Sequence, residues 1–183
     1  MNCAVEFPIL QIGEFVLTHP KIAIPDNAAT FAINASNERF WEPPVRRYVK
    51  ECLAGETGPR GRDFGMRWVA SLIAEAYRVL VRGGVFLYPV DDRSRETGGR
   101  LGLLHEANPI AFIMEQAGGA AITGRSRILD QEPTDLHQRT PFIFGSRGEV
   151  ELIHAYHKDY VEGRDSNSYD FPLFGNRSLF RNE

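Results

Sequence analysis

The sequence predicts an α/β fold in which a mixed β-sheet is flanked by helices. Short apolar, strand-like runs alternate with segments of helical periodicity along the chain. One run, "VFLYP" (85–89), is apolar at almost every position, which is typical of a strand buried on both faces. Glycine pairs at 83–84 and 118–119 follow two helical segments and are expected to end them.

The first half of the chain predicts strands at 13–20 and 30–35, separated by a turn-rich segment. Segment 43–55 opens with two prolines that suit a helix start, and Gly55 is expected to end this helix. Residues 56–65 read as a loop. A helix is predicted from about Arg67 to Arg82, because apolar residues recur there every three to four positions.

In the second half, a polar turn follows the strand at 85–89 and leads to a strand expected at 100–105. A helix from Pro109 to about Ala117, strands at 120–124 and 141–146, and a surface helix at 147–159 complete the predicted elements. Residues 1–160 are expected to form one domain. Residues 161–183 are polar and turn-rich and are expected to form a C-terminal extension over a surface or a neighbouring subunit.

Composition narrows the function classes. Hydrophobic residues make up 43% of the 183-residue chain and charged residues 25%, and the net charge is −3. We expect no general attraction to nucleic acid or to anionic membrane, so an anion site must come from a local cluster of Arg and Lys. Cys3 and Cys52 lack metal-type spacing, and the apolar runs are too short or too charged to cross a bilayer. A soluble cytoplasmic protein is expected.

Glu106 is the first candidate functional residue. It stands between the apolar run 101–104 and a helix start at Asn108-Pro109. A carboxylate at such a junction could belong to a metal or phosphate site. It could also cap the helix, because the helix dipole stabilises an acidic group near a helix N-terminus. Spacing alone favours the cap.

Two further features suit a phosphate ligand. Arg67 and Trp68 lie at or near the expected start of a helix, and both helix N-termini and guanidinium groups suit phosphate oxygens. Tyr88 ends the buried strand and Arg100 follows across the turn, so the hydroxyl could meet a ligand there. The simpler interpretation is a solvated Arg67, a core Trp68 and a Tyr88 hydroxyl that satisfies a backbone carbonyl.

The histidines give little indication of a metal or catalytic site. His105 and Glu106 would point to opposite faces if the strand at 100–105 continued. His154 and His157 are expected on a solvated helix face. The sequence contains no P-loop, dinucleotide fingerprint or Ser-His-Asp signature.

Four segments taken together resemble one family, class 1 fructose-1,6-bisphosphatase. They are "GEFVLTHPKIAIP", "GGVFLYP", "LLHEANPIAFIMEQAGG" and "PTDLHQRTPFIFGS", in the family's order. The tail "FPLFGNRSLF" is similar to that of bacterial members associated with carbon-fixation gene clusters. The resemblance runs from about Phe15 to Tyr156 and covers only the family's C-terminal half. The "DPxDGSS"-type motif of the N-terminal half, which carries most metal-binding carboxylates, is absent from this sequence. A half-length fragment, a truncated gene product or an expressed domain is therefore expected.

The resemblance implies a sugar-phosphate site. Asn34 matches an Asn that touches the 6-phosphate, and Arg67 matches an Arg that reaches a neighbouring subunit's 6-phosphate. Trp68 replaces a phosphate-binding Tyr, which removes a hydroxyl donor but keeps an aromatic wall. Tyr88 matches directly. Arg100 replaces a Lys, so the charge remains with the fork geometry of a guanidinium.

The resemblance also implies that Glu106 binds Mg²⁺, but only together with the missing N-terminal half, because such a cation needs further oxygen ligands. Gly102 stands where the family has an Arg near the 1-phosphate. The implied function is hydrolysis of the 1-phosphate of fructose 1,6-bisphosphate to fructose 6-phosphate in carbohydrate metabolism, by a homo-oligomer. No catalytic residue falls in this chain, which is expected to be inactive alone. The alternative is a catalytically silent sugar-phosphate-binding or interaction module derived from that enzyme.

Overall fold

The computed structural model describes residues 3–9 and 13–164, so the predicted tail beyond residue 164 lies outside the described residues. The elements in chain order are β1 (Cys3–Ile9), β2 (Glu14–Ile22), β3 (Thr30–Ala32), η1 (Ala35–Phe40), α1 (Pro43–Leu53), η2 (Gly55–Thr57), β4 (Gly65–Met66), α2 (Leu72–Arg82), β5 (Val85–Tyr88), β6 (Leu101–Gly102), η3 (Leu103–Ala107), α3 (Asn108–Gln116), β7 (Ala120–Ile122), η4 (Ile128–Asp130), β8 (Arg139–Thr140), β9 (Phe142–Gly145) and α4 (Arg147–Val161).

A mixed five-stranded sheet forms the centre of the molecule, in the order β4-β3-β5-β9-β7. β3 runs parallel to β4 and β5, whereas β9 is antiparallel to β5 and β7. The expected class, a mixed sheet flanked by helices, is confirmed. β5 lies in the middle and its first three residues are buried, as its apolar run predicts.

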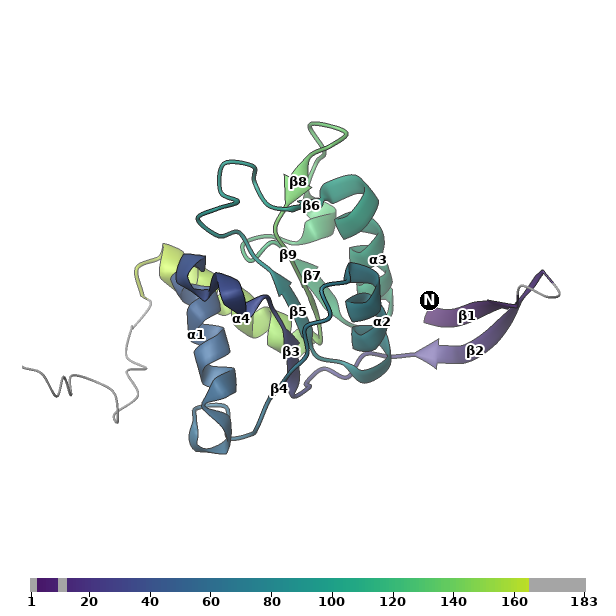
Figure 1. The fold of residues 1–183 in the computed structure, drawn as a ribbon, viewed down its shortest axis with the longest axis horizontal. Helices are drawn as coiled ribbons and strands as arrows, with labels where there is room; N and C mark the ends of the chain where they lie inside the picture. Colours follow the sequence, from purple (N-terminus) through teal and green to yellow (C-terminus); the bar gives the residue numbers. More distant parts are fainter. Residues whose placement is uncertain (1–2, 10–12, 165–183) are drawn as a thin grey trace, which may run out of the picture.

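Helices cover both faces of this sheet: α1 and α4 lie on one side, α2 and α3 on the other (Figure 1). Alternate strand residues face opposite layers, as a pleated strand requires. In β5, for example, Val85 and Leu87 pack with α1 and α4, and Phe86 packs with α2 and α3. The sheet therefore separates two hydrophobic cores, one on each of its faces. A functional site is then expected at the ends of the strands.

β1 and β2 form an antiparallel hairpin that projects away from the sheet and its helices (Figure 1). The sequence predicted β2 but not β1. The chain joins the main body at Ile24, which is buried and whose backbone N–H donates to the carbonyl of Ala117 at 2.8 Å.

The helix expected from about Arg67 begins later, at Leu72, so placing Arg67 at a helix start was wrong. Ala70 has a positive φ of 61°, which interrupts helical geometry. Ser71 then caps α2, and its hydroxyl oxygen accepts from the N–H of Ala74 at 3.5 Å. Arg67 instead follows β4, where its backbone N–H donates to the carbonyl of Phe31 at 2.8 Å.

The strand expected at 100–105 ends at Gly102. Residues Leu103–Ala107 form a π-helical turn that leads directly into α3. The N–H of Leu103 still donates to the carbonyl of Gln138, which continues the pairing with β8, but the N–H of Asn108 donates to the carbonyl of Leu103 and closes the π-helical turn. Glu106 therefore lies on a helical turn and not on a strand.

A buried ionic cluster ties the loop before β4 to α4. Glu149 is fully buried, and its carboxylate accepts from Arg60 at 2.6 and 2.7 Å, from Arg62 at 2.5 Å and from the Tyr48 hydroxyl at 2.7 Å. Burial raises the pKa of Tyr48, and the negative charge of Glu149 adds to this rise. Burial alone would lower the pKa of Arg60, but the hydrogen bonds and charge of Glu149 outweigh it and raise that pKa.

The expected solvated face of α4 was wrong for His157. This residue is 2% exposed, and its Nδ1 lies 2.9 Å from the carbonyl oxygen of Ile153. Burial lowers the pKa of the imidazole, so the folded chain favours its neutral form. Cys52 behaves as the small buried hydrophobe that the sequence suggested, and burial raises its thiol pKa to about 12. Within the described ranges, no helix combines the length and apolar character needed to cross a bilayer.

Candidate functional site

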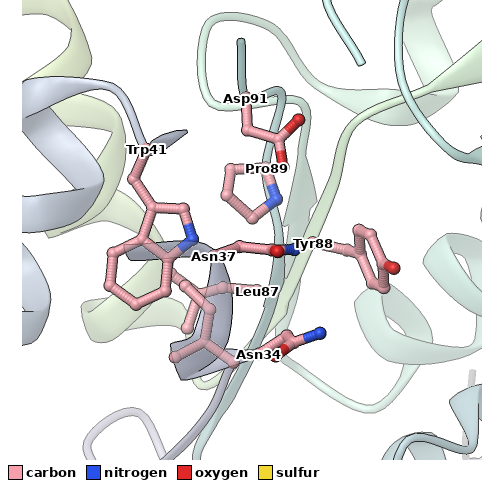
Figure 2. A pocket seen from close by; sticks show the side chains of 8 residues that line it. Asn34, Asn37, Trp41, Leu87, Tyr88, Pro89 and Asp91 are labelled. Carbon is pink, nitrogen blue, oxygen red and sulfur yellow. The ribbon is translucent and has the colours of Figure 1, made fainter. Parts of the chain in front are cut away.

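The carboxyl end of β5 opens into a small polar notch. Asn34 and Asn37 line it from η1 and the residue before, and Tyr88 and Asp91 line it from the end of β5 and the turn beyond. Figure 2 shows the Trp41 indole on one side of the strand end and the Tyr88 phenol pointing to the other. The notch has a volume of about 10 Å³, close to the space that one water molecule needs.

Asn34 is held by its own turn. Its side-chain oxygen accepts from the Ser36 N–H at 3.2 Å and from the Ser36 hydroxyl at 2.6 Å. This arrangement caps η1 and fixes the amide orientation at the entrance of the turn. No bond to the Asn34 amide nitrogen is present among the described residues, which leaves that donor group for a ligand or water.

Tyr88 and Trp68 form an aromatic wall beside the notch. The Trp68 ring stacks on Phe86, with centroids 5.8 Å apart, and lies 6.0 Å from the Tyr88 ring at a tilted angle. Both residues are half-buried and pack against the core on the α2 and α3 side. Because Phe86 belongs to central β5, the rigid sheet supports both rings from beneath.

Arg100 reaches this region through Asp91. Asp91 is 3% exposed, and its Oδ1 accepts from the Ser94 hydroxyl at 2.7 Å and from the Arg93 N–H at 3.1 Å. Its Oδ2 lies 3.7 Å from an Arg100 guanidinium nitrogen. Arg100 Nε is buried without a hydrogen-bond partner among the described residues. The turn therefore brings one guanidinium group next to the notch, with a donor still unused.

Arg67 is not drawn into the notch. Its side chain is exposed and donates to the carbonyl of Met66 at 3.0 Å. It precedes Trp68 directly, so it lies at the outer edge of the aromatic wall. The structure thus groups Asn34 and Tyr88 in one notch, places Trp68 and Arg100 beside it, and leaves Arg67 at the surface.

Glu106 lines a different hollow, of about 180 Å³, together with Gly102, His105, His137 and Arg139. Its Oε2 accepts from the Gly102 N–H at 2.6 Å and lies 3.7 Å from the His105 ring nitrogen. The carboxylate therefore satisfies a backbone donor of the residue before the π-helical turn and forms no cap bond at the start of α3. The strand does not continue here, so His105 and Glu106 meet.

The described residues include no group of three or more His, Cys, Asp or Glu side chains arranged to hold a metal ion. Mg²⁺ prefers six oxygen ligands in near-octahedral geometry. One half-exposed carboxylate that already accepts a backbone hydrogen bond does not fit that requirement by itself.

Gly102 borders the same hollow. A β-carbon added there would lie 2.2 Å from His105 Cε1 and within 2.8 Å of both ring nitrogens. The backbone at Gly102 has φ −70° and ψ 131°, which any residue can adopt. The His105 ring therefore occupies the space that a side chain at position 102 would take.

Sequence reasoning missed Asn37, Trp41 and Asp91 in the notch, and Arg139 beside Glu106. Asp91 carried a usable signal, because it lies three residues beyond the end of the buried strand and such strand ends meet ligands. Arg139 carried none. It joins the site because β8 pairs with β6, and its guanidinium then donates to the Arg100 carbonyl at 2.7 Å.

Comparison with known proteins gives the relationship. Residues 24–158 match the family described as "Fructose-1-6-bisphosphatase, C-terminal domain". The chain is 61% identical over 173 residues to a fructose-1,6-bisphosphatase class 1 of Hydrogenophilus thermoluteolus, covering 94% of this chain and 47% of that protein. It is 60% identical over 170 residues to "Fructose-1,6-bisphosphatase class 1 3" of Methylibium petroleiphilum, covering 93% and 46%.

The fold agrees with that relationship. The holo form of Leishmania major fructose-1,6-bisphosphatase superimposes with a TM-score of 0.77 at 39% identity, over 85% of this chain and 46% of that chain. The chain spans about half the length of the curated relatives it matches. The resemblance read from the four sequence segments is confirmed, including its restriction to a C-terminal half. Because the match extends over residues 24–158, most of the chain, this protein belongs to the fructose-1,6-bisphosphatase C-terminal domain family.

Proposed function

We propose that this chain is the sugar-phosphate-binding half of a fructose-1,6-bisphosphatase. In this proposal, residues 1–160 form the binding domain, and Asn34, Trp68, Tyr88 and Arg100 contact the sugar and its distal phosphate. The observation that carries it is their arrangement: Asn34 and Tyr88 share one notch, Trp68 contacts Tyr88, and Arg100 faces the Asp91 carboxylate of that notch. Relatives about 60% identical are named fructose-1,6-bisphosphatases.

The geometry suits recognition of a phosphate ester more than its cleavage. The notch is too small for a sugar, so the ligand would lie above it, against the Tyr88 and Trp68 rings. Arg100 would supply a charge-assisted, fork-shaped donor pair, and the Asn34 amide would supply a neutral donor. Binding energy gained here would position the other end of the substrate for reaction. Exposed Arg67 would complete such a site in a second subunit of a homo-oligomer.

Glu106 enters this proposal only as one ligand of a cation site completed by groups outside the chain. The residues around it do not fit a complete Mg²⁺ site, as argued above, so no catalytic step is assigned to this chain.

Tryptophan fluorescence offers a direct test, because both tryptophans of the chain, Trp41 and Trp68, lie at the notch or its wall. Titration of the full chain with fructose 6-phosphate should change the emission, and Trp41→Phe and Trp68→Phe should show which indole responds. Arg100→Gln should weaken binding about 10- to 100-fold, since a hydrogen bond to a charged group contributes about 1.5–3 kcal/mol. Arg100→Lys should retain more affinity than Arg100→Gln.

Arg82→Gln is the matched control, because Arg82 is exposed at the end of α2, near the opposite end of β5 from Tyr88. Fructose without phosphate is the ligand control. Equal binding of fructose and fructose 6-phosphate, or equal weakening by the two glutamine variants, would contradict the proposal.

A catalytically silent module is the second candidate function. It is favoured by one observation: Glu106 is engaged with the Gly102 N–H, and no metal-type cluster accompanies it among the described residues. Phosphate release from fructose 1,6-bisphosphate with Mg²⁺ separates the two candidates. We expect the chain alone to release no more phosphate than its Glu106→Ala variant. Release restored by adding a metal-binding half from a relative would favour the enzyme, and continued silence would favour the module.

A further inference from the structure

The turn η1 has a second face that the proposed substrate site does not use. An open hollow of about 580 Å³ lies between η1 and α1. Its lining residues are Ala35, Ser36, Glu38, Arg39, Arg46 and Lys50. It is a broad surface depression with room for a small anion.

The lining carries three cations and one carboxylate. In the part of the chain that the structure describes, no ion pair to an acidic side chain forms at Arg39, Arg46 or Lys50. Other arginines are paired in this structure: Arg60, Arg62, Arg78, Arg125 and Arg127 each meet a Glu within 3.0 Å. A protein with a net charge of −3 therefore gathers three unneutralised cations around one hollow.

One of these cations is fixed in place. The Arg46 guanidinium donates to the carbonyls of Glu38 at 3.4 Å and of Trp41 at 3.2 Å through a single nitrogen, Nη2. Within residues 3–9 and 13–164, its other N–H donors form no hydrogen bond. Lys50 lies one helical turn further along α1, so both head groups project from the same face of the helix. Arg39 lines the hollow from η1, and its guanidinium lies 4.7 Å from the centroid of the Phe40 ring.

The hollow is separate from the notch at Tyr88. Residues Asn34 and Asn37 line the notch, whereas Ala35, Ser36 and Glu38 line the hollow, so the same turn divides the two. Ser36 links them, because its hydroxyl donates to the Asn34 side-chain oxygen at 2.6 Å.

We propose that this hollow, defined by Arg39, Arg46 and Lys50, binds a small phosphorylated anion. Three convergent cations suit a ligand with two or more negative charges, since one charge would leave the others unneutralised. The lining contains no aromatic ring and Ala35 is its only apolar residue, so it offers no platform on which a nucleobase could stack. The ligand class is therefore a phosphate ester or condensed phosphate without a base.

Pyrophosphate is the probe for this site, measured by isothermal titration calorimetry on the full chain. Arg46→Gln should weaken binding at least tenfold, and Lys50→Gln should weaken it several-fold. Glu38→Gln should tighten binding, because it removes the one negative charge from the lining. This opposite sign keeps the test decisive even if Arg46→Gln perturbs the fold. Inorganic phosphate should bind more weakly than pyrophosphate, and added salt should weaken both.

Two further variants locate the binding. Arg82→Gln removes an exposed cation outside the hollow and should leave pyrophosphate affinity unchanged. Arg100→Gln removes the cation at the notch, where the proposed function places a phosphate ester, and should leave unchanged the binding event that Arg46→Gln weakens. Loss of binding in Arg100→Gln with no effect of Arg46→Gln would place the anion at the notch and overturn the proposal. Equal losses in Arg82→Gln and Arg46→Gln, equal affinity for phosphate and pyrophosphate, or no binding at all would overturn it too.

Discussion

The buried carboxylate of Glu149 holds the loop that leads to Arg67, and its removal is the most informative single change in this chain. Glu149→Ala would leave the guanidinium of Arg60, whose side chain is 12% exposed, without its only carboxylate partner in the structure described. It would also leave the buried Tyr48 hydroxyl without an acceptor. Arg62 would suffer less, because its side chain is 36% exposed and can regain water.

The expected loss follows from these contacts. Removing one partner of a buried ion pair costs about 3–5 kcal/mol, since the remaining charge stays desolvated. The orphaned hydroxyl adds about 1–3 kcal/mol, although the two costs overlap because both groups share the same carboxylate. We expect a decrease in the free energy of unfolding of about 4 kcal/mol, a large fraction of the stability of a domain of this size.

Urea unfolding followed by circular dichroism measures the loss. With a slope of about 2 kcal/mol/M, the midpoint should fall by about 2 M while the slope itself stays unchanged. Glu151→Ala is the matched control, since Glu151 is exposed on the same helix and should change stability by less than about 0.5 kcal/mol. Tyr48→Phe should cost about 1 kcal/mol, because it removes only one of the hydrogen bonds. A loss below about 1 kcal/mol for Glu149→Ala would refute the reasoning.

Three further outcomes are expected. Gly102→Arg should fold normally, because the φ angle at this position is ordinary and the His105 side chain, which is 63% exposed, can move aside. In a chain rejoined to a relative's metal-binding half, this variant should raise kcat more than it lowers KM. The added arginine should stabilise the transition state by up to about 2–4 kcal/mol. Unchanged turnover would show that the arginine is dispensable. The chain should self-associate at high micromolar concentration through exposed apolar residues of α2. Ile73→Glu should weaken the self-association, because Ile73 is 71% exposed and the variant places a charge on that surface. A monomeric mass of the parent chain by light scattering would contradict this prediction. Stability should fall as pH drops below about 6.5, because burial lowers the pKa of His157 below its unfolded value and the unfolded chain then binds the extra proton. His157→Phe should flatten that slope in urea titrations at pH 7 and 5.5, whereas His137→Gln, at an exposed position, should not.

The strands and helices were largely predictable because their signals are local. The apolar run of β5 and the 3.6-residue periodicity of α2 depend on neighbouring residues alone, so β5 appears where expected and α2 ends where expected, at Arg82. The candidate residues Tyr88 and Arg100 could be read in the same way, since a strand end and the turn beyond it are adjacent in sequence. Asn34 came from the family resemblance. Trp68 was noted beside Arg67 from the sequence, but its role in the site came from that resemblance, which in turn depended on four matching segments.

Element boundaries were less predictable, because single backbone angles and single hydrogen bonds decide them. The positive φ of Ala70 delays α2 and moves Arg67 away from a helix start. β6 ends at Gly102 because the N–H of Asn108 donates to the carbonyl of Leu103 and closes a π-helical turn, which brings Glu106 to the Gly102 N–H. Neither the late start of α2 nor the early end of β6 can be recognised from the neighbouring residues in the sequence.

By itself, the sequence determined the fold class, the central strand with Tyr88 at its end, and membership of a bisphosphatase family limited to one half. Only the tertiary structure decided which distant groups meet. Glu149 meets Arg60, Arg62 and Tyr48 across 87 to 101 residues of chain. Asn37 and Asp91, which are also far apart in the sequence, line the same notch. Such encounters depend on how two helical layers close over one sheet, and contacts between residues far apart in sequence leave no periodic pattern that the sequence alone could show.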